Sequence, residues 1–256
     1  MNMKDHRILV TGAGSGLGRG VAHFLGEHGA QIFAVDLNLP GAEQTAQELR
    51  AAGGRAQAFR CDVTDPAAVA ALVQALPEPP DVLINNAGLQ HVVKIEEFPV
   101  EKWDLLIAVM VKGPFLLARA LLPAMRKNGF GRIVNIGSIH SLVASKYKAA
   151  YVTAKHALVG LTKTLALETA DSDITVNTIC PSYILTPLVE KQIAQQAQMH
   201  GLTPAQVTSE IFLKPMPKQA FVGIDEVAAL AEFLLGPHAK NITGQTIAID
   251  GGWTAQ

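Results

Sequence analysis

The chain has 256 residues, of which 49% are hydrophobic and 17% are charged. This length suits one large α/β domain with a substantial core, and the composition is typical of a globular protein rather than a disordered one. The formal net charge is -1 and no basic stripe is present, which argues against nucleic acid as a partner. No basic amphipathic stretch or uncharged apolar run of spanning length is found, so we expect no membrane partner.

Cysteine and histidine usage bounds the compartment and the chemistry. Cys61 and Cys180 form no C-x-x-C pair, and the first residues lack the apolar segment and cleavage site of a signal peptide. These features predict a reduced, cytoplasmic protein. The eight histidines show no H-E-x-x-H or similar spacing, so the sequence predicts no metal site.

Short β-branched runs alternate with longer helical patterns along the chain. Strands are predicted at 7–11, 31–35, 55–59, 81–85, 132–136, 175–179 and 246–249. Helices are predicted at 16–28, 41–52, 66–75, 100–127, 150–169 and 225–235.

Several of these strands are almost entirely apolar, as strands buried on both faces are. The alternation therefore predicts an α/β fold: a doubly wound, Rossmann-type parallel sheet of about seven strands with helices on both faces, forming a single domain over 1–256. One irregular region, 182–223, is polar and contains four prolines. We expect it to form short helices that act as a lid over the strand ends.

A glycine-rich loop joins the first strand to the first helix. The text T-G-x-x-x-G-x-G covers Gly12, Gly16 and Gly18, with Ser15 just before Gly16 and Leu17 between Gly16 and Gly18. In this place, free N–H groups and the helix dipole can bind a dinucleotide pyrophosphate. Asp36 follows at the end of the second strand, where a carboxylate accepts both adenosine-ribose hydroxyls and repels a 2′-phosphate. Leu37 and Asn38 supply no cation, so we expect the cofactor to be NAD.

Three further motifs complete a recognisable pattern. Asn85-Asn86-Ala87-Gly88 follows the fourth strand, Ser138 follows the fifth, and Tyr151 and Lys155 stand four residues apart. In order and spacing the chain resembles the short-chain dehydrogenase/reductase family over its full length. The resemblance implies that Ser138, Tyr151 and Lys155 are catalytic.

The chemistry of these residues is consistent with that role. Tyr151 and Lys155 share one helix face, and an ammonium beside a phenol is expected to lower the pKa of the phenol. Tyr151 can then take the alcohol proton as hydride leaves for the nicotinamide, while Ser138 hydrogen-bonds the substrate oxygen. The resemblance further implies that the cofactor contacts a larger set: Gly12, Ser15, Gly16, Leu17, Gly18, Asp36, Asp62, Val63, Asn86, Ala87, Gly88, Tyr151, Lys155, Pro181, Ile184 and Thr186.

The chain departs from the family pattern at two positions. Met110 stands where the family usually has an asparagine that helps to hold a water of the proton relay, and a thioether cannot replace an amide. A backbone carbonyl at Met110 could still bind such a water, so a modified relay and impaired catalysis both remain open. Ser182 follows Pro181 where glycine is common.

The resemblance extends to a bacterial group within the family, the D-3-hydroxybutyrate dehydrogenases. Segments 88–91, 102–104, 129–132, 186–192 and 250–254 look like that group. There the substrate carboxylate is held by two glutamines, a histidine and a lysine, which match Gln90, Gln192, His140 and Lys148. Ser138, Tyr151 and Trp253 complete the expected substrate pocket, with Trp253 walling off a short alkyl group.

These features predict reversible, NAD-dependent oxidation of a small 3-hydroxy acid, D-3-hydroxybutyrate, to the keto acid. Two rivals stay open: a relative that acts on another alcohol, ketone or longer hydroxy acid, and an NAD-binding module with little catalysis, which Met110 alone favours. Family members are commonly tetramers, so we expect a homotetramer. The stretch 114–118 and the helix at 157–167 fit either a buried face or an interface.

Overall fold

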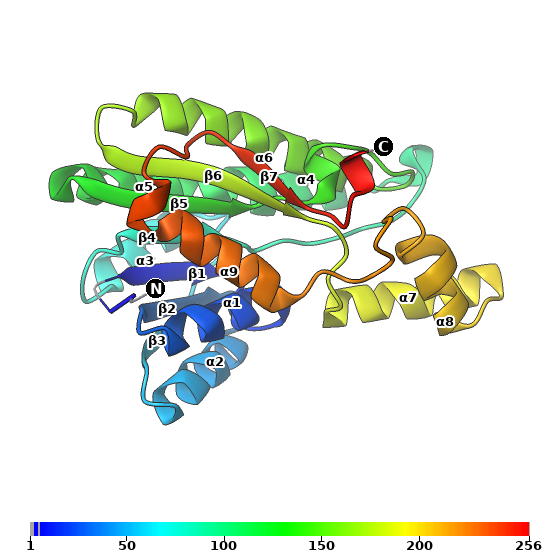
Figure 1. Ribbon diagram of the computed structural model, residues 1–256, viewed down its shortest axis with the longest axis horizontal. Coiled ribbons are helices and arrows are strands. Elements are labelled where there is room, and N and C mark those ends of the chain that lie inside the picture. The colour runs from blue at the N-terminus through cyan, green and yellow to red at the C-terminus, as the bar shows by residue number, and fades with distance from the viewer. Residues whose placement is uncertain (1–2, 5, 256) are drawn as a thin grey trace.

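A seven-stranded parallel sheet forms the centre of the protein (Figure 1), which confirms the predicted fold class. The computed structural model describes residues 3–4 and 6–255; Met1, Asn2, Asp5 and Gln256, which the predicted domain includes, lie outside the described residues. The strands are β1 (Arg7–Thr11), β2 (Gln31–Asp36), β3 (Arg55–Arg60), β4 (Val82–Asn85), β5 (Phe130–Ile136), β6 (Asp173–Pro181) and β7 (Thr246–Ile249). The longer helices are α1 (Gly16–Glu27), α2 (Leu39–Ala51), α3 (Pro66–Ala75), α4 (Val100–Ile107), α5 (Gly113–Asn128), α6 (Ala149–Glu168), α7 (Pro187–His200), α8 (Pro204–Val207) and α9 (Ile224–Leu235).

The strand order is β3-β2-β1-β4-β5-β6-β7, and every neighbouring pair is parallel. The chain winds outward from β1 to β3, then returns to place β4 on the other side of β1. The carboxyl ends of β1 and β4 therefore lie side by side at the point where the winding reverses. In doubly wound sheets a ligand crevice opens at this point.

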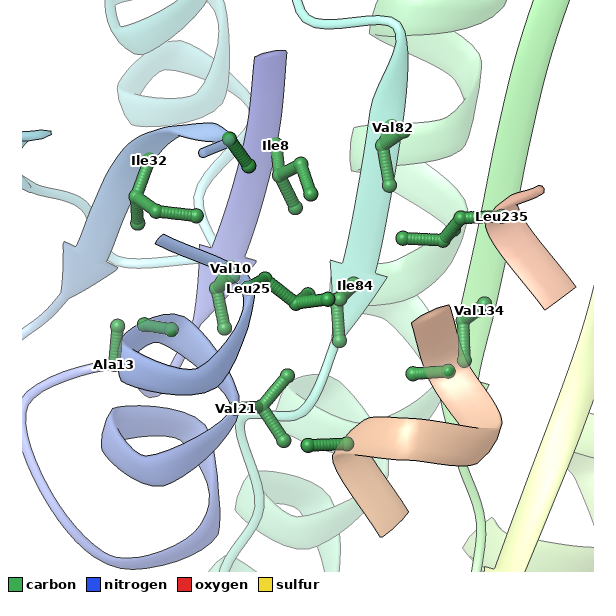
Figure 2. Close-up of a cluster of buried hydrophobic side chains, with 14 of the residues drawn as sticks. Ile8, Val10, Ala13, Val21, Leu25, Ile32, Val82, Ile84, Val134 and Leu235 are labelled. Atoms are coloured by element: carbon green, nitrogen blue, oxygen red, sulfur yellow. The ribbon is translucent and has the colours of Figure 1, made fainter. Parts of the chain in front are cut away.

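Alternate side chains of the strands bury on opposite faces of the sheet. In β1, Ile8 and Val10 belong to one hydrophobic cluster, while Leu9 belongs to another on the opposite face. Figure 2 shows the first cluster, in which Val21 and Leu25 of α1 pack near these strand residues. Helices α1, α2 and α9 cover this face, and α3, α5 and α6 contribute to the cluster on the other. Both faces are thus buried, which explains the apolar strand sequences.

The long helix predicted at 100–127 is interrupted by a π-helical turn at Ala108–Lys112 between α4 and α5. The backbone N–H of Gly113 reaches back five residues to the carbonyl of Ala108. Pro114 follows and has no N–H to give to the carbonyl of Met110, four residues before it. The wider turn accommodates this missing donor, and periodicity in the sequence does not reveal it.

By length and composition alone, the helical stretch Val100–Asn128 could cross a membrane. In the fold, however, Leu117, Leu121 and Met125 of α5 lie in the core cluster against the sheet. The apolar side chains of the helix therefore pack in the core of the protein.

The predicted excursion at 182–223 contains α7, α8 and a second π turn, Thr208–Phe212. Its helices stand beside the sheet at the right of Figure 1 and have a small core of their own, made by Val189, Ile193, Ala197, Val207 and Phe212. The short helices that the sequence led us to expect are present. The lid role of this segment stays a prediction.

We predict that Gly129→Ala lowers the melting temperature by about 3 °C. Gly129 caps α5 with φ of +69°, a conformation that costs an L-residue about 1–2 kcal/mol, and a domain of this size loses about 2–4 °C for each kcal/mol. Gly129→Asn serves as the matched control and should lose less, because asparagine tolerates this conformation better. Differential scanning calorimetry measures both, and equal melting temperatures for wild type and Gly129→Ala would contradict the prediction.

Candidate active site

A cavity of about 610 Å³ opens at the carboxyl ends of the strands. It brings together nearly all of the predicted site residues. Those that line it are Gly12, Ser15, Gly16, Leu17, Asp36, Asp62, Val63, Asn86, Ala87, Gly88, Gln90, Ser138, His140, Lys148, Tyr151, Lys155, Pro181, Ile184, Thr186 and Gln192. Two predicted residues, Gly18 and Trp253, lie behind this wall.

The glycine loop between β1 and α1 forms one end of the cavity. Gly12 and Gly16 have positive φ values of +66° and +53°, so the loop turns in a way that glycine tolerates best. Ser15 precedes α1 without a side-chain cap, and the first turn of the helix has no acidic residue. The N–H groups of this turn are therefore available to a phosphate, and the helix dipole adds positive potential. This arrangement fits a dinucleotide pyrophosphate.

Gly18 supports the loop from beneath. A Cβ atom at Gly18 would lie 2.3 Å from the carbonyl oxygen of Gly12 and 2.4 Å from Nδ2 of Asn86. Glycine is required there because helix and loop pack closely, and this position contributes no surface to the cavity. The expected cofactor contact at Gly18 stays a prediction, and the structure assigns this glycine a packing role.

The segment after β4 is tied to the same loop. Nδ2 of Asn86 donates to the carbonyl of Thr11, and the N–H groups of Asn86 and Ala87 donate to Oγ1 of Thr11 at 3.0 and 3.1 Å. These bonds hold the ends of β1 and β4 together, so the two sides of the crevice keep a fixed separation.

Carboxylates mark the ends of β2 and β3. Asp36 accepts the N–H of Gly14 at 2.8 Å and that of Asn38 at 2.9 Å, one on each carboxylate oxygen. Each oxygen retains acceptor capacity for a ribose hydroxyl. Asp62 accepts hydrogen bonds from the backbone and hydroxyl of Thr64, which lower the pKa of its carboxyl group. Both residues line the cavity as negatively charged groups.

Ser138, Tyr151 and Lys155 meet where β5 and α6 approach each other. Ser138 caps the short turn Ile139–Ser141 after β5, and its side chain hydrogen-bonds Tyr151 of α6. Lys155 lies one helical turn beyond Tyr151, with its Nζ 5.6 Å from the centroid of the tyrosine ring. The same Nζ donates to the carbonyl of Ile136 at 2.6 Å. The predicted catalytic residues therefore form one cluster.

Burial controls the protonation of this cluster. It raises the pKa of Tyr151, against the opposing effect of the hydrogen bond from Ser138, and it lowers the pKa of Lys155 to about 8. The expectation that the ammonium lowers the pKa of the phenol is therefore not met in this structure. The physical reason is that desolvation dominates, while Nζ of Lys155 donates to the carbonyl of Ile136 and lies over the Tyr151 ring, 5.6 Å from its centroid.

Met110 lies in the π turn beside this cluster and is 1% exposed. It packs against Leu106, Ala150 and Ala154, with Tyr151 alongside. The thioether thus fills apolar space and gives the catalytic residues no amide donor.

A second cluster surrounds Lys148, which is only 6% exposed although it follows a loop. Its Nζ lies 3.4 Å from Nε2 of His140 and 3.2 Å from the hydroxyl oxygen of Tyr183. Ser145 also contacts Nε2 of His140, at 3.2 Å. Because the ammonium can only donate, His140 accepts through Nε2 and is neutral. Among the described residues, no carboxylate forms an ion pair with Lys148.

Desolvation sets the charges of this cluster as well. It lowers the pKa of Lys148 to about 8, and burial together with the nearby Lys148 ammonium lowers that of His140 to about 4. Near pH 7 the cluster therefore holds one buried positive charge surrounded by neutral groups. Such a site favours an anionic ligand, because a buried charge without a counter-ion is costly.

The backbone at Tyr147 directs Lys148 into the cavity. Tyr147 has φ of +68°, which is uncommon for a residue other than glycine, and its ring is exposed. Its carbonyl accepts the N–H of Val93 at 2.9 Å, so the loop that follows β4 is joined to the loop before α6. Gln90 and Lys148 are thereby carried on two connected loops.

The remaining predicted substrate residues have different positions. Gln90 and the half-buried Gln192 of α7 line the cavity. Trp253 sits behind the wall, with its ring 6.0 Å from that of His140 and 5.9 Å from that of Tyr183. It supports the pocket through these two residues and does not line it.

Sequence reasoning missed Tyr183. This residue lines the cavity and contacts Lys148, but it belongs to no motif. The available signal is its position between Pro181 and Ile184, two of the residues that the resemblance assigns to the cofactor.

Comparisons with known proteins agree with this geometry. A family model described as short chain dehydrogenase matches residues 6–197. The chain belongs to the short-chain dehydrogenase family. It is an oxidoreductase that acts on CH–OH groups, and the fold binds a nicotinamide dinucleotide.

The similar proteins carry several substrate names. The chain is 46% identical over 253 residues to the D-beta-hydroxybutyrate dehydrogenase of Rhizobium meliloti, covering 97% of this chain and 98% of the relative. It is 41% identical to the protein of the same name from Cupriavidus necator, covering 97% of each. A crystal structure of actinorhodin polyketide ketoreductase with NADPH superposes with a TM-score of 0.93 at 34% identity, covering the whole of both chains.

We predict that Gly12→Ala weakens NADH binding at least about tenfold. An added Cβ would lie 2.8 Å from Nδ2 of Asn86 and 3.0 Å from Cα of Ala87, and the positive φ adds strain at a loop that must approach a phosphate. Gly129→Ala carries similar backbone strain far from the cavity and should bind NADH as wild type does. Titration of NADH fluorescence gives both dissociation constants. Equally weak NADH binding in the two variants would show that general backbone strain, and not the shape of the glycine loop, is responsible.

Proposed function

We propose that this protein is an NAD-dependent dehydrogenase of small 3-hydroxy acids, which interconverts D-3-hydroxybutyrate and acetoacetate. The observation that carries the proposal is the buried Lys148 ammonium, which lacks a counter-ion among the described residues and lines the same cavity as Tyr151. A substrate with a carboxylate near its reacting alcohol supplies the missing negative charge. The two relatives named D-beta-hydroxybutyrate dehydrogenase support the assignment.

The chain's own residues fit such a cofactor and reaction. The glycine loop and the start of α1 would hold the pyrophosphate, Asp36 the adenosine ribose, and Pro181, Ile184 and Thr186 the nicotinamide end. The bound nicotinamide supplies hydride chemistry. Ser138 holds the substrate oxygen by a hydrogen bond; Tyr151 as the phenolate takes the proton from that oxygen in oxidation, and as the phenol it returns the proton in reduction. Lys155 would support the tyrosine and the ribose from the next turn of α6.

Substrate recognition follows from the second cluster. Lys148 binds the carboxylate, and Gln90 and Gln192 donate amide hydrogens that fix its orientation. Because Gln192 lies on α7, occupation of the site would draw the excursion toward the cavity. The rings of His140 and Tyr183 line the cavity and would bound a short alkyl group, with the ring of Trp253 packed behind them.

A matched pair of variants separates the acid-binding role from the catalytic role. Lys148→Met should raise KM for D-3-hydroxybutyrate by about 10–100-fold, since hydrogen bonds to charged groups contribute about 1.5–3 kcal/mol, and should leave the turnover of 2-butanol unchanged. Tyr151→Phe should lower kcat for both substrates by about 10²–10⁴. Steady-state NADH formation measures these constants, with L-3-hydroxybutyrate as a control for stereochemistry.

The results also distinguish the rivals. A dehydrogenase of neutral alcohols would turn over 2-butanol well and would not respond to Lys148→Met. Tight NADH binding without turnover of any alcohol would support a weakly catalytic module, and recovery in Met110→Asn would assign the defect to the proton relay.

We further propose that NAD is preferred over NADP. The carboxylate of Asp36 lines the cavity at the end of β2, and Leu37 and Asn38 offer no cation to a 2′-phosphate. The similar ketoreductase was solved with NADPH, so the proposed preference rests on the residues of this chain at the end of β2.

Asp36→Asn should reduce the ratio of kcat/KM for NAD to that for NADP by about tenfold or more. The change removes the charge that repels a 2′-phosphate and keeps one acceptor oxygen. Asp62→Asn is the control, because Asp62 follows a different strand, β3, and the substitution should affect both cofactors alike. An unchanged ratio in Asp36→Asn, or a wild-type preference for NADP, would reject the proposal.

A homotetramer is also proposed. The core uses Leu116, Leu117 and Ala118 of α5, which are buried within one chain, whereas Phe115 remains 46% exposed and Leu167 of α6 remains 80% exposed. These exposed apolar side chains support an interface along α5 and α6.

A further inference from the structure

Tyr183 joins the excursion to the buried charge of the pocket. It lies two residues after the end of β6, and its ring is 4.6 Å from that of Phe212, a 1% exposed residue of the excursion core. On its other side the ring of Trp253 is 5.9 Å away. Its carbonyl accepts the N–H of Val222 at 2.9 Å. Ring packing and this backbone bond fix the place of the side chain.

The ring contacts of Tyr183 do not account for its hydroxyl group. A phenylalanine would make the same ring contacts, and burying a hydroxyl is unfavourable unless it finds a partner. Its recorded partner is Nζ of Lys148, at 3.2 Å, and the same Nζ lies 5.2 Å from the centroid of the ring. Since an ammonium has donors only, Tyr183 is the acceptor. Burial raises the pKa of Tyr183 to about 12, so the hydroxyl stays neutral while it accepts.

The ammonium of Lys148 has three N–H donors, and two of them have recorded acceptors, His140 and Tyr183. These acceptors come from different elements, the turn after β5 and the segment after β6, and both are neutral near pH 7. Together they orient the ammonium without cancelling its charge. No third acceptor is found among the described residues, so one N–H donor is available to a carboxylate.

We propose that Tyr183 is the positioning residue for Lys148, and that its hydroxyl holds the ammonium in the place where the substrate carboxylate binds. The inference rests on the proposed hydroxy-acid function, because it assigns how that site recognises an acid. Tyr183 contributes to the affinity for acids and makes no difference to the transfer of hydride or proton.

The test compares Tyr183→Phe with Lys148→Met. Tyr183→Phe keeps the ring against Phe212 and Trp253 and removes only the acceptor. It should raise KM for D-3-hydroxybutyrate about tenfold, keep kcat within about threefold, and leave KM for 2-butanol unchanged. A parallel increase in KM for 2-butanol, or a matching fall in kcat, would indicate a merely structural role and overturn the proposal.

The pH profile gives a second readout. The titratable groups that contact Nζ of Lys148 are His140 from the turn after β5 and Tyr183 from the segment after β6; both are neutral in the working range. In wild type, 1/KM for the acid should fall above about pH 8, where Lys148 loses its proton. Removing an acceptor destabilises the ammonium, so Tyr183→Phe should move this fall to lower pH. Lys148→Met should abolish it, and an unmoved fall in Tyr183→Phe would contradict the proposal.

Acetate binding separates this inference from the proposed function. In a Trp103→Phe background, Trp253 is the remaining tryptophan and reports on the pocket through its contacts with His140 and Tyr183. With NADH bound, acetate should change its fluorescence in that background, about tenfold more weakly after Tyr183→Phe, and not after Lys148→Met. This pattern without turnover of D-3-hydroxybutyrate would reject the substrate and keep the inference. Turnover that depends on Lys148, with equal acetate affinity in the Tyr183→Phe variant, would reject the inference and keep the substrate.

Discussion

Parallel strands end at one edge of the sheet, and this constraint gathers the groups that directly follow the strands into one cavity. Six consecutive strands each deliver a segment to the same cavity: the glycine loop after β1, Asp36 at the end of β2, Asp62 after β3, Asn86 after β4, Ser138 after β5 and Pro181 at the end of β6. Positions far apart in the sequence become neighbours because their strands are neighbours. Hydrogen bonds from Asn86 and Ala87 to Thr11 then close the junction between the two halves of the sheet.

This constraint also explains which parts of the site could be predicted. A residue that directly follows a strand has its place fixed by the sheet, so Asp36, Asn86 and Ser138 could be assigned from sequence. Lys148 and Tyr183 depend on how loops and the excursion pack, which periodicity does not encode. The burial of Lys148 and its contact with Tyr183 became visible only in the structure. For the same reason, sequence reasoning predicts that Trp253 and Gly18 line the cavity, whereas the structure shows them packed behind its lining.

The interruption of the long helix shows a similar limit. Apolar periodicity runs through 100–127 without a break, yet the backbone widens at Ala108–Lys112. The decisive residue is Pro114, whose effect lies four residues upstream at the carbonyl of Met110. The side chain of Met110 therefore belongs to the apolar cluster beside the site, and Tyr151 is the catalytic residue that packs against this cluster. Met110 lacks the amide that the family usually has at this position, but in this fold its side chain also packs the core.

The Lys148 ammonium, with which no carboxylate of the described residues pairs, affects how the stability of the protein depends on pH. Its pKa falls from an ordinary value of 10.5 to about 8, so between these values the unfolded chain holds more protons than the folded one. Stability conferred through this group therefore increases as the pH rises across that window, and at neutral pH the fold bears the full cost of the buried cation. An anion that settles beside the ammonium returns that stability by mass action. If this site binds acids as proposed, the anion in a storage buffer should affect the heat stability of the purified protein, with a short carboxylate stabilising it more than chloride at the same ionic strength.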